Sequence, residues 1–320
     1  MGRPEETANG LFLDGTDGTI LQRIENLDAQ IQTQNIDSNQ DEHDELLLAR
    51  FATLALIGLG TGPSTSANRW QYTLNAPPLS SLIGDFSGDG QEELIIGTED
   101  GRLLSLTALE GVPRFLNPVG GEISHLATLP RAGGDTPFIA LTRNNDDTNP
   151  RNDDPVHWVE VRDGNGERVW GDQLPAPASA LIIDSMLSPQ RIQTIIVATT
   201  AGHLLAFDRN GTPQWTHQLR SPARINHLLV TRRRELTLAS YSQESSAIFH
   251  TTGAGNRELS VSLVVLTADG QAHGLNWRGF EMRQQAWPQS LSAPATAVSQ
   301  FQPPFVTAST EDAFLVATRG

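Results

Sequence analysis

Short apolar runs, separated by turn residues, recur along the whole chain. In the stretch 93–106, the apolar run Leu94–Ile96 is followed by the turn residues Asp100 and Gly101 and then by a second apolar run. Two such runs joined by Asp-Gly are typical of a β-hairpin. Because the first run has three consecutive apolar residues, its strand is expected to be covered on both faces.

The same hairpin pattern is repeated at other places in the sequence. The turn glycine is Gly18, Gly202 or Gly270 in three of the copies, and Ala313 takes its place in the last one. These copies lie at 11–21, 195–207, 263–275 and 305–316. Recurrence of one hairpin predicts a repetitive fold that consists of β-strands.

A second repeated element gives the length of the repeat. Each of four tryptophans is followed by leucine after four residues and by proline after seven, namely Trp70, Trp170, Trp215 and Trp287. A degenerate fifth copy begins at Phe115, which lies 45 residues after Trp70, the same step as from Trp170 to Trp215. We expect these aromatic side chains to lie on outer strands and to pack between neighbouring repeats.

A period near 45 residues, with several short strands in each repeat, is typical of a β-propeller. The sequence therefore predicts an all-β chain with one β-propeller of seven four-stranded blades, or alternatively six or eight blades. A polar tail is expected at 1–9 and the propeller at 10–320, with incomplete terminal blades. The expected blades are 10–35, 46–77, 79–119, 122–177, 179–222, 224–294 and 295–320, with insertions at 143–155 and 243–259.

The loop that precedes the hairpin at 93–106 carries the candidate metal site. Oxygen-bearing side chains occupy positions 1, 3, 5 and 9 of this loop, and alternate loop residues can point toward one cation. Gly90 permits the sharp turn that brings the last carboxylate back. Oxygen ligands favour Ca²⁺ over zinc, although a turn rich in Asp and Gly also forms without an ion. The expected ligands are the side chains of Asp85, Ser87, Asp89 and Glu93 and the backbone carbonyl of Gln91.

Parts of this sequence resemble two families of propeller repeats. The stretch 83–106 resembles the FG-GAP or VCBS repeat of integrin-type propellers, and this resemblance implies a calcium loop before the hairpin. The stretch 195–219 resembles the repeat of quinoprotein-like (PQQ-type) propellers, with its hairpin glycine, its Asp-x-Asn-Gly turn and its tryptophan. Both resemblances imply the propeller fold, and neither identifies a function, because propellers serve many functions.

Composition narrows the classes of partner. The chain has 37 acidic and 22 basic residues and a net charge of −15, which disfavours binding to nucleic acid or to an anionic membrane. No apolar run is long enough to cross a bilayer, so direct membrane insertion is not expected. The polar residues 1–9 do not resemble a signal peptide. The absence of cysteine is compatible with an extracytoplasmic or secreted location and does not decide it.

Sequence motifs assign no catalytic or cofactor-binding residue. The eight histidines lack the paired spacings of zinc sites, and without cysteine there is no thiolate ligand or nucleophile. Two functions are therefore considered. The first is a non-catalytic scaffold that binds another protein or a surface ligand. The alternative is a quinone-dependent dehydrogenase, although the adjacent cysteine pair of many alcohol-oxidising members of that family is missing here.

Overall fold

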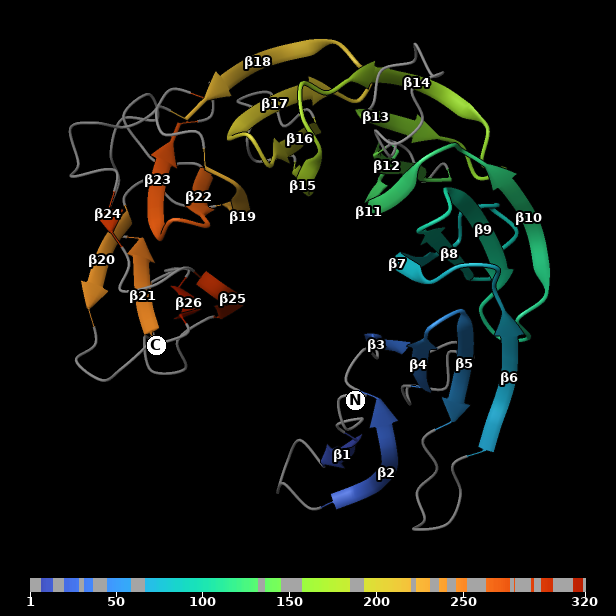
Figure 1. The fold of residues 1–320 in the computed structure, drawn as a ribbon. Helices are drawn as coiled ribbons and strands as arrows, with labels where there is room; N and C mark the ends of the chain where they lie inside the picture. Colours follow the sequence, from blue (N-terminus) through green and yellow to red (C-terminus); the bar gives the residue numbers. More distant parts are fainter. Residues whose placement is uncertain are drawn as a thin grey trace, which may run out of the picture. The chain divides into compact units, whose positions relative to one another are not determined.

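In the computed structural model the described residues form β-strands, turns and loops, and no helix occurs among them (Figure 1). The chain divides into two compact units, of which unit 1 comprises Met1–Leu126, Pro130–Ile139 and Arg162–Glu167, and unit 2 comprises the remaining residues. The described residues are 7–13, 20–28, 32–36, 45–58, 67–131, 136–144, 157–184, 193–219, 223–230, 236–240, 246–251, 263–276, 279, 289–290, 295–301 and 313–318.

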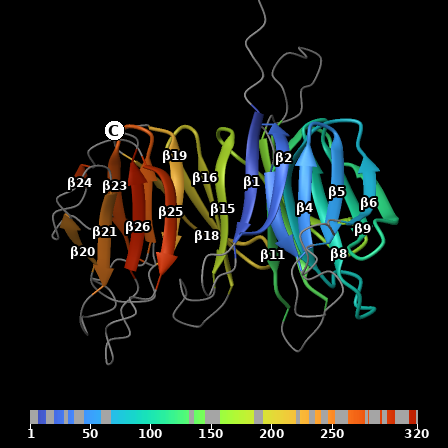
Figure 2. The ribbon, with the colours of Figure 1, turned by 90° about the horizontal axis from the view of Figure 1, so that it is seen from below.

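Antiparallel pairing groups the first strands of the chain into three sheets. A two-stranded sheet contains β1 (Thr7–Leu13) and β2 (Ile20–Asp28). The next sheet has the order β3 (Gln32–Ile36), β4 (Glu45–Arg50), β5 (Thr53–Gly58) and β6 (Ala67–Thr73), and Figure 2 shows β4, β5 and β6 side by side. The third has the order β7 (Pro78–Gly84), β8 (Glu93–Thr98), β9 (Arg102–Thr107) and β10 (Pro113–Pro118).

Two further sheets also contain four strands that follow one another in sequence. One has the order β11 (Glu122–Leu129), β12 (Phe138–Asn144), β13 (His157–Arg162) and β14 (Arg168–Gln173). The other has the order β15 (Ala178–Asp184), β16 (Thr194–Thr199), β17 (His203–Asp208) and β18 (Pro213–Gln218). In each case the fourth strand carries the repeated aromatic residue, as the spacing predicts.

In the last two sheets, a hairpin that follows the first strand of one sheet in sequence belongs to the other sheet. One has the order β19 (Ile225–Val230), β22 (Leu263–Thr267), β23 (Gln271–Leu275) and β24 (Gln289–Ser290). The other has the order β20 (Leu236–Ser240), β21 (Ser246–Thr251), β26 (Ala313–Thr318) and β25 (Ala295–Phe301). The hairpin formed by β20 and β21 is therefore inserted after β19 in sequence but pairs with the C-terminal strands.

Strand pairing differs from the expected blade limits at two places. The stretch 224–294, expected as one blade, contributes strands to two sheets, so that β25 and β26 belong to a sheet of four strands. Residues 32–36, expected at the end of the first blade, pair with β4 and join the next sheet. The first difference arises because β21 pairs with the distant strand β26, and such pairing leaves no periodic mark in the local sequence.

The repeated hairpin turns are confirmed at 93–106, 195–207 and 263–275. In the first, Gly101 has a φ of 76°, and the backbone N–H of Arg102 donates a 2.9 Å hydrogen bond to Oγ1 of the buried Thr98. The same bonds to threonine recur at the turns of Gly202 and Gly270. Only glycine adopts this left-handed conformation without strain. The first half of the hairpin expected at 305–316 lies outside the described residues.

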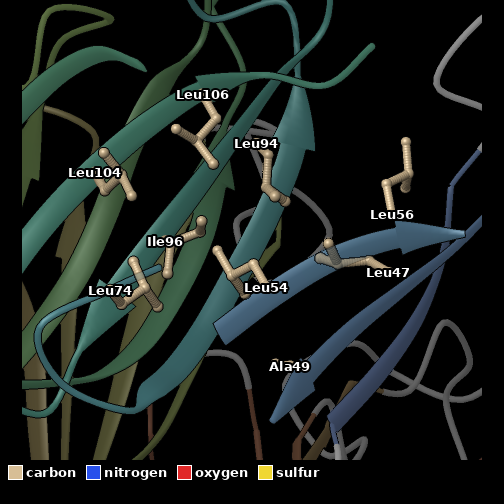
Figure 3. Packing of buried hydrophobic residues seen from close by; sticks show 9 residues of the cluster. All are labelled: Leu47, Ala49, Leu54, Leu56, Leu74, Leu94, Ile96, Leu104 and Leu106. Carbon is tan, nitrogen blue, oxygen red and sulfur yellow. The ribbon is translucent and has the colours of Figure 1, made fainter. Parts of the chain in front are cut away.

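Consecutive apolar residues of the second strand in each sheet form the cores. Leu94 and Ile96 of β8 pack with Leu104 of β9 and with Leu54 and Leu56 of β5, so two sheets contact each other face to face in unit 1 (Figure 3). In unit 2, an equivalent core joins the sheet that contains β16 to the sheet that contains β22. Each fully buried leucine or isoleucine contributes about 1.5–3 kcal/mol relative to exposure. The expectation that this strand is covered on both faces is confirmed.

The repeated aromatic side chains lie against glycines in the turn of a neighbouring sheet. A β-carbon added to Gly111 would lie 2.6 Å from Cδ2 of Trp70, and one added to Gly211 would lie 2.7 Å from Cδ2 of Trp170. The indole N–H of Trp70 also donates a 2.9 Å hydrogen bond to the carbonyl of Ala108. The other aromatic–glycine pairs are Phe115 with Gly166 and Trp215 with Gly279.

These contacts confirm the predicted packing between repeats and the degenerate copy at Phe115. The rings are partly buried, which is less than the substantial burial expected for Trp170 and Trp215. Leucines four residues after the tryptophans are buried at 74, 174 and 219. Trp287 lies outside the described residues.

Candidate functional site

The predicted metal loop connects β7 to β8 and is anchored by one buried side chain. Phe86 is 1% exposed, and Gly88 and Gly90 have φ values of 79° and 83°. A β-carbon added to Gly164 would lie 1.8 Å from the carbonyl oxygen of Phe86, so the turn 163–167 approaches the loop backbone closely. The positive φ values confirm that glycine is needed for the sharp turn, as Gly90 predicts.

Hydrogen bonds within the loop hold the three carboxylates in place. Oδ1 and Oδ2 of Asp85 accept the backbone N–H groups of Gly88 and Gly90 at 2.6 and 2.9 Å. Oδ1 of Asp89 accepts the N–H of Gln91 at 2.9 Å. These bonds orient the aspartates, and both carboxylates remain on the solvent-accessible side of the loop.

Glu93 is the buried member of the set, with 1% exposure. Its Oε2 accepts the N–H groups of Phe86 and Ser87 at 2.7 and 3.1 Å, and its Oε1 accepts the hydroxyl of Ser87 at 2.7 Å. The carboxylate therefore closes the loop at the first residue of β8, as predicted. The hydroxyl of Ser87, which is expected to contribute its oxygen to a cation, donates its hydrogen to Glu93, and its role as a ligand stays a prediction.

The spacing of the carboxylates suits a calcium ion. One oxygen each of Asp85, Asp89 and Glu93 lies within 4.8 Å of the others. Ca²⁺ binds oxygen at 2.3–2.6 Å, so two ligands on opposite sides of the ion are about 5 Å apart. The donor set of three carboxylates, with all oxygen atoms, therefore fits Ca²⁺. The contribution expected from the carbonyl of Gln91 stays a prediction.

Arg114 on β10 brings a positive charge to these carboxylates. Its Nη2 donates to Oδ2 of Asp89 at 2.5 Å, and its Nε lies 3.2 Å from Oε1 of Glu93. The hydrogen bond from Arg114 lowers the pKa of Asp89, and the bond to Asp89 raises the pKa of Arg114. The guanidinium group thus supplies cationic charge at the position expected for a metal ion.

Sequence reasoning missed Arg114, although the repeat contains a signal for it. Arg114 directly precedes Phe115, and Arg69 directly precedes Trp70, so the two arginines hold the same place in the repeat. Nη2 of Arg69 lies 2.5 Å from Oε1 of Glu45, which is 1% exposed and begins β4 as Glu93 begins β8. The buried Glu–Arg pair is therefore a repeated feature of two successive sheets.

The sequence before Glu45 also repeats the spacing of the loop. Asp37, Asn39, Asp41 and Glu45 follow one another at the intervals that separate Asp85, Ser87, Asp89 and Glu93. Of this second set only Glu45 lies in the described part of the chain. Alignment of 37–49 with 85–97 would have shown this degenerate second copy.

Comparisons with known proteins identify the fold and no family. The sequence matches no protein-family model and no curated protein. The crystal structure of BBS1N in complex with ARL6DN is similar with a TM-score of 0.56 and 15% identity, over 94% of this chain and 82% of that chain. BamB from Moraxella catarrhalis is similar with a TM-score of 0.53 and 15% identity, over 97% of this chain and 79% of that chain.

Raptor from Chaetomium thermophilum extends this likeness to a larger protein. Its TM-score is 0.57 at 10% identity, over 98% of this chain and 26% of that chain. These similarities, together with the antiparallel sheets, show that the chain has a β-propeller fold. The predicted fold is confirmed, and the number of blades stays a prediction. In the described part of the chain, no helical segment has the length and hydrophobicity needed to cross a bilayer.

Proposed function

We propose that this chain is a non-catalytic β-propeller scaffold that binds another protein. Exposed apolar side chains on the outer strand β10 and in the turn that precedes it carry the proposal. Among the described residues, three of the five exposed large hydrophobic side chains lie between positions 109 and 116, namely Leu109, Val112 and Leu116. Hydrophobic residues that gather on a surface mark sites of protein contact more often than single ones do.

β10, which carries Leu116 and follows the turn with Leu109 and Val112, is accessible to a partner. β10 is the edge strand of its sheet, and Leu116 is 46% exposed. At the equivalent position after the repeated aromatic residue, β18 has the polar Thr216, which is also exposed. The central strands β8 and β9 are largely buried, whereas most residues of β10 are exposed and can contact another molecule. A protein partner is also consistent with the crystal structure of BBS1N in complex with ARL6DN, in which BBS1N has a fold similar to that of this chain.

A crosslinking experiment tests the scaffold. The wild-type chain, Leu116→Glu and Thr216→Glu would be crosslinked in extract of the source cells, and the crosslinked proteins identified by mass spectrometry. Loss of a specific partner in Leu116→Glu and its retention in Thr216→Glu is the expected result. An equal set of partners for all three chains would contradict the proposal, because a buried charge in the interface must weaken binding.

A structural Ca²⁺ ion in the loop 85–93 is the finer part of the proposal. Asp85, Asp89 and Glu93 would hold the ion, and its charge would fix the loop between β7 and β8. Binding to the folded state alone raises stability by about 2.7 kcal/mol at a hundredfold excess over the dissociation constant. The proposal has one requirement, since Arg114 contacts two of the three carboxylates and must move aside when the ion binds.

Thermal unfolding with Ca²⁺ and with chelator tests the ion. The wild-type melting temperature should rise with Ca²⁺, and Asp89→Ala should lose this response. An unchanged wild-type melting temperature, together with no Ca²⁺ binding by calorimetry at millimolar concentration, would mean that Arg114 alone closes the loop. The quinone-dependent dehydrogenase stays a prediction, and no observation among the described residues favours it.

A further inference from the structure

A cluster of charged and aromatic side chains in unit 2 lies outside the candidate metal loop 85–93. It consists of Arg143 on β12, Trp158 and Glu160 on β13, and Arg168 on β14. Nε of Arg143 donates a 2.8 Å hydrogen bond to Oε1 of Glu160, which is 1% exposed. The Cζ atoms of Arg143 and Arg168 lie 5.3 and 4.7 Å from the centroid of the Trp158 ring. Both distances are in the range of cation–π contacts.

Of the two arginines that face Glu160, Arg168 is the more loosely paired. Nη1 of Arg168 lies 3.9 Å from Oε1 of Glu160, which is beyond hydrogen-bond distance. Glu160 faces two arginines, and Arg143 makes the closer contact. Within the described residues the Arg168 guanidinium makes no hydrogen bond, and 40% of its side chain is exposed. Arg168 therefore presents a guanidinium group with free donors in a chain of net charge −15.

The position of Arg168 depends on a missing side chain. A β-carbon added to Gly171 would lie 2.5 Å from Nη2 of Arg168, so the guanidinium group lies over this glycine. Gly171 directly follows the repeated aromatic Trp170, and the equivalent positions in other sheets carry Gln71, Leu116 and Thr216. The guanidinium group stacks on the Trp158 ring and lies over Gly171. Because these contacts restrict its position, little side-chain entropy is lost when a ligand binds it.

We propose that Arg168 and Trp158 form a binding site for the carboxylate of an acidic side chain on a protein partner. The guanidinium fork donates two parallel hydrogen bonds to one carboxylate, which gives strength and fixed geometry. Tryptophan and arginine are also the residues that most often dominate the energy of a protein interface. Because this site would bind the protein partner of the scaffold, the proposal rests on the proposed function.

Charge favours a carboxylate over a phosphate as the occupant. The guanidinium group of Arg168 carries one positive charge, which matches the single negative charge of an aspartate or glutamate side chain. A phosphate dianion would leave one negative charge uncompensated in a chain that is already strongly acidic. The site therefore selects a glutamate or aspartate of the partner.

A titration with short peptides tests the site directly. An acetylated hexapeptide with six glutamates, the matched glutamine hexapeptide and inorganic phosphate would each be added to the ¹⁵N-labelled chain. The side-chain N–H signals of Trp158 and Arg168 report binding. The glutamate peptide should produce saturable shifts of both signals, and Arg168→Gln should weaken its binding at least tenfold. Arg209→Gln removes a different exposed arginine and should leave the affinity unchanged.

A second variant keeps the positive charge of Arg168 and displaces its guanidinium group. Gly171→Thr introduces the residue that β18 has at this position and pushes the Arg168 guanidinium aside, so it should also weaken peptide binding at least tenfold. Equal shifts with the glutamine peptide, or unchanged affinity in both variants, would overturn the site. Tighter binding of phosphate than of the glutamate peptide would overturn the carboxylate assignment. Because the titration uses free peptide, its result is independent of the crosslinking result for Leu116.

Discussion

The indole of Trp170 lies against Gly211 in the turn between β17 and β18. The indole N–H donates a 3.0 Å hydrogen bond to the carbonyl of Arg209 in the same turn. Gly211 has a φ of 85°, and a β-carbon there would lie 2.7 Å from Cδ2 of the indole. Two requirements therefore meet at one residue, a left-handed backbone and the absence of a side chain, and together they fix the register between two sheets.

Gly211→Ala should destabilise the protein for both of these reasons. A left-handed conformation costs a non-glycine residue about 1–3 kcal/mol, and overpacking against the indole adds to this loss. Urea unfolding at neutral pH measures the change. Gly120→Ala is the matched control, because Gly120 has a φ of 78° and its added β-carbon would meet nothing within 4 Å. If both variants lose the same stability, the indole contact contributes nothing.

Trp215→Ala should remove the corresponding contact with Gly279. A fully buried aromatic residue costs about 3–5 kcal/mol when it is cut to alanine. Trp215 is partly buried, so we expect a loss of about 2 kcal/mol in urea unfolding. Trp215→Phe should keep most of this stability, because a ring still covers Gly279. A loss no larger for alanine than for phenylalanine would show that the contact area does not matter.

Acid should weaken the contact between Arg114 and Asp89. The hydrogen bond from Arg114 lowers the pKa of Asp89 below its ordinary value of 3.8. A carboxyl group with a lowered pKa contributes stability above its unfolded pKa and loses it as the pH falls through its folded pKa. The stability difference between wild type and Arg114→Gln should therefore be constant from pH 7 to about pH 4 and shrink below pH 3.8.

Urea unfolding midpoints between pH 2 and 7 measure this dependence. Arg102→Gln is the control, because Arg102 pairs with Asp100 on the surface, with Nε 3.0 Å from Oδ2. Exposed pairs of this kind contribute about 0–1 kcal/mol. A stability difference for Arg114→Gln that stays the same down to pH 2 would mean that the arginine acts by packing and not by charge.

Arg114→Gln should also bind Ca²⁺ more tightly than the wild type, because the guanidinium group and the ion require the same oxygens of Asp89 and Glu93. We expect at least a tenfold lower dissociation constant by calorimetry, equal to about 1.4 kcal/mol. Equal affinities for wild type and variant would show that Arg114 does not compete. If neither chain binds Ca²⁺, the proposed ion itself is absent.

Sequence reasoning identified the features that depend on local residues. The threonine and glycine of each turn lie within four positions of each other, and the aromatic residue and its leucine are equally close in sequence. The repeat spacing also predicted the degenerate copy at Phe115, which makes the same contact with a glycine as the tryptophans do. Pairing of β21 with β26 was missed, since four other strands, β22 to β25, lie between them in the sequence.

In the candidate loop, too, contacts between nearby residues could be predicted from the sequence, and a contact from another strand could not. Convergence of Asp85, Asp89 and Glu93 could be predicted because alternate residues of one short turn face the same side. The contact of Arg114 could not be derived from the loop, because the arginine lies on a different strand of the sheet. Only a comparison with Arg69 and Glu45, at the same places of the preceding repeat, would have indicated it.

The pairing of β21 with β26 sets an order of events while the chain is being made. Ala247 pairs with Val316, so the hairpin of β20 and β21 leaves the ribosome well before its partner strand exists. During that interval β21 presents an unpaired edge, the kind of surface that promotes aggregation. Contacts between residues so distant in sequence also form slowly. Assembly of this last sheet therefore has to wait until synthesis of β26 is complete.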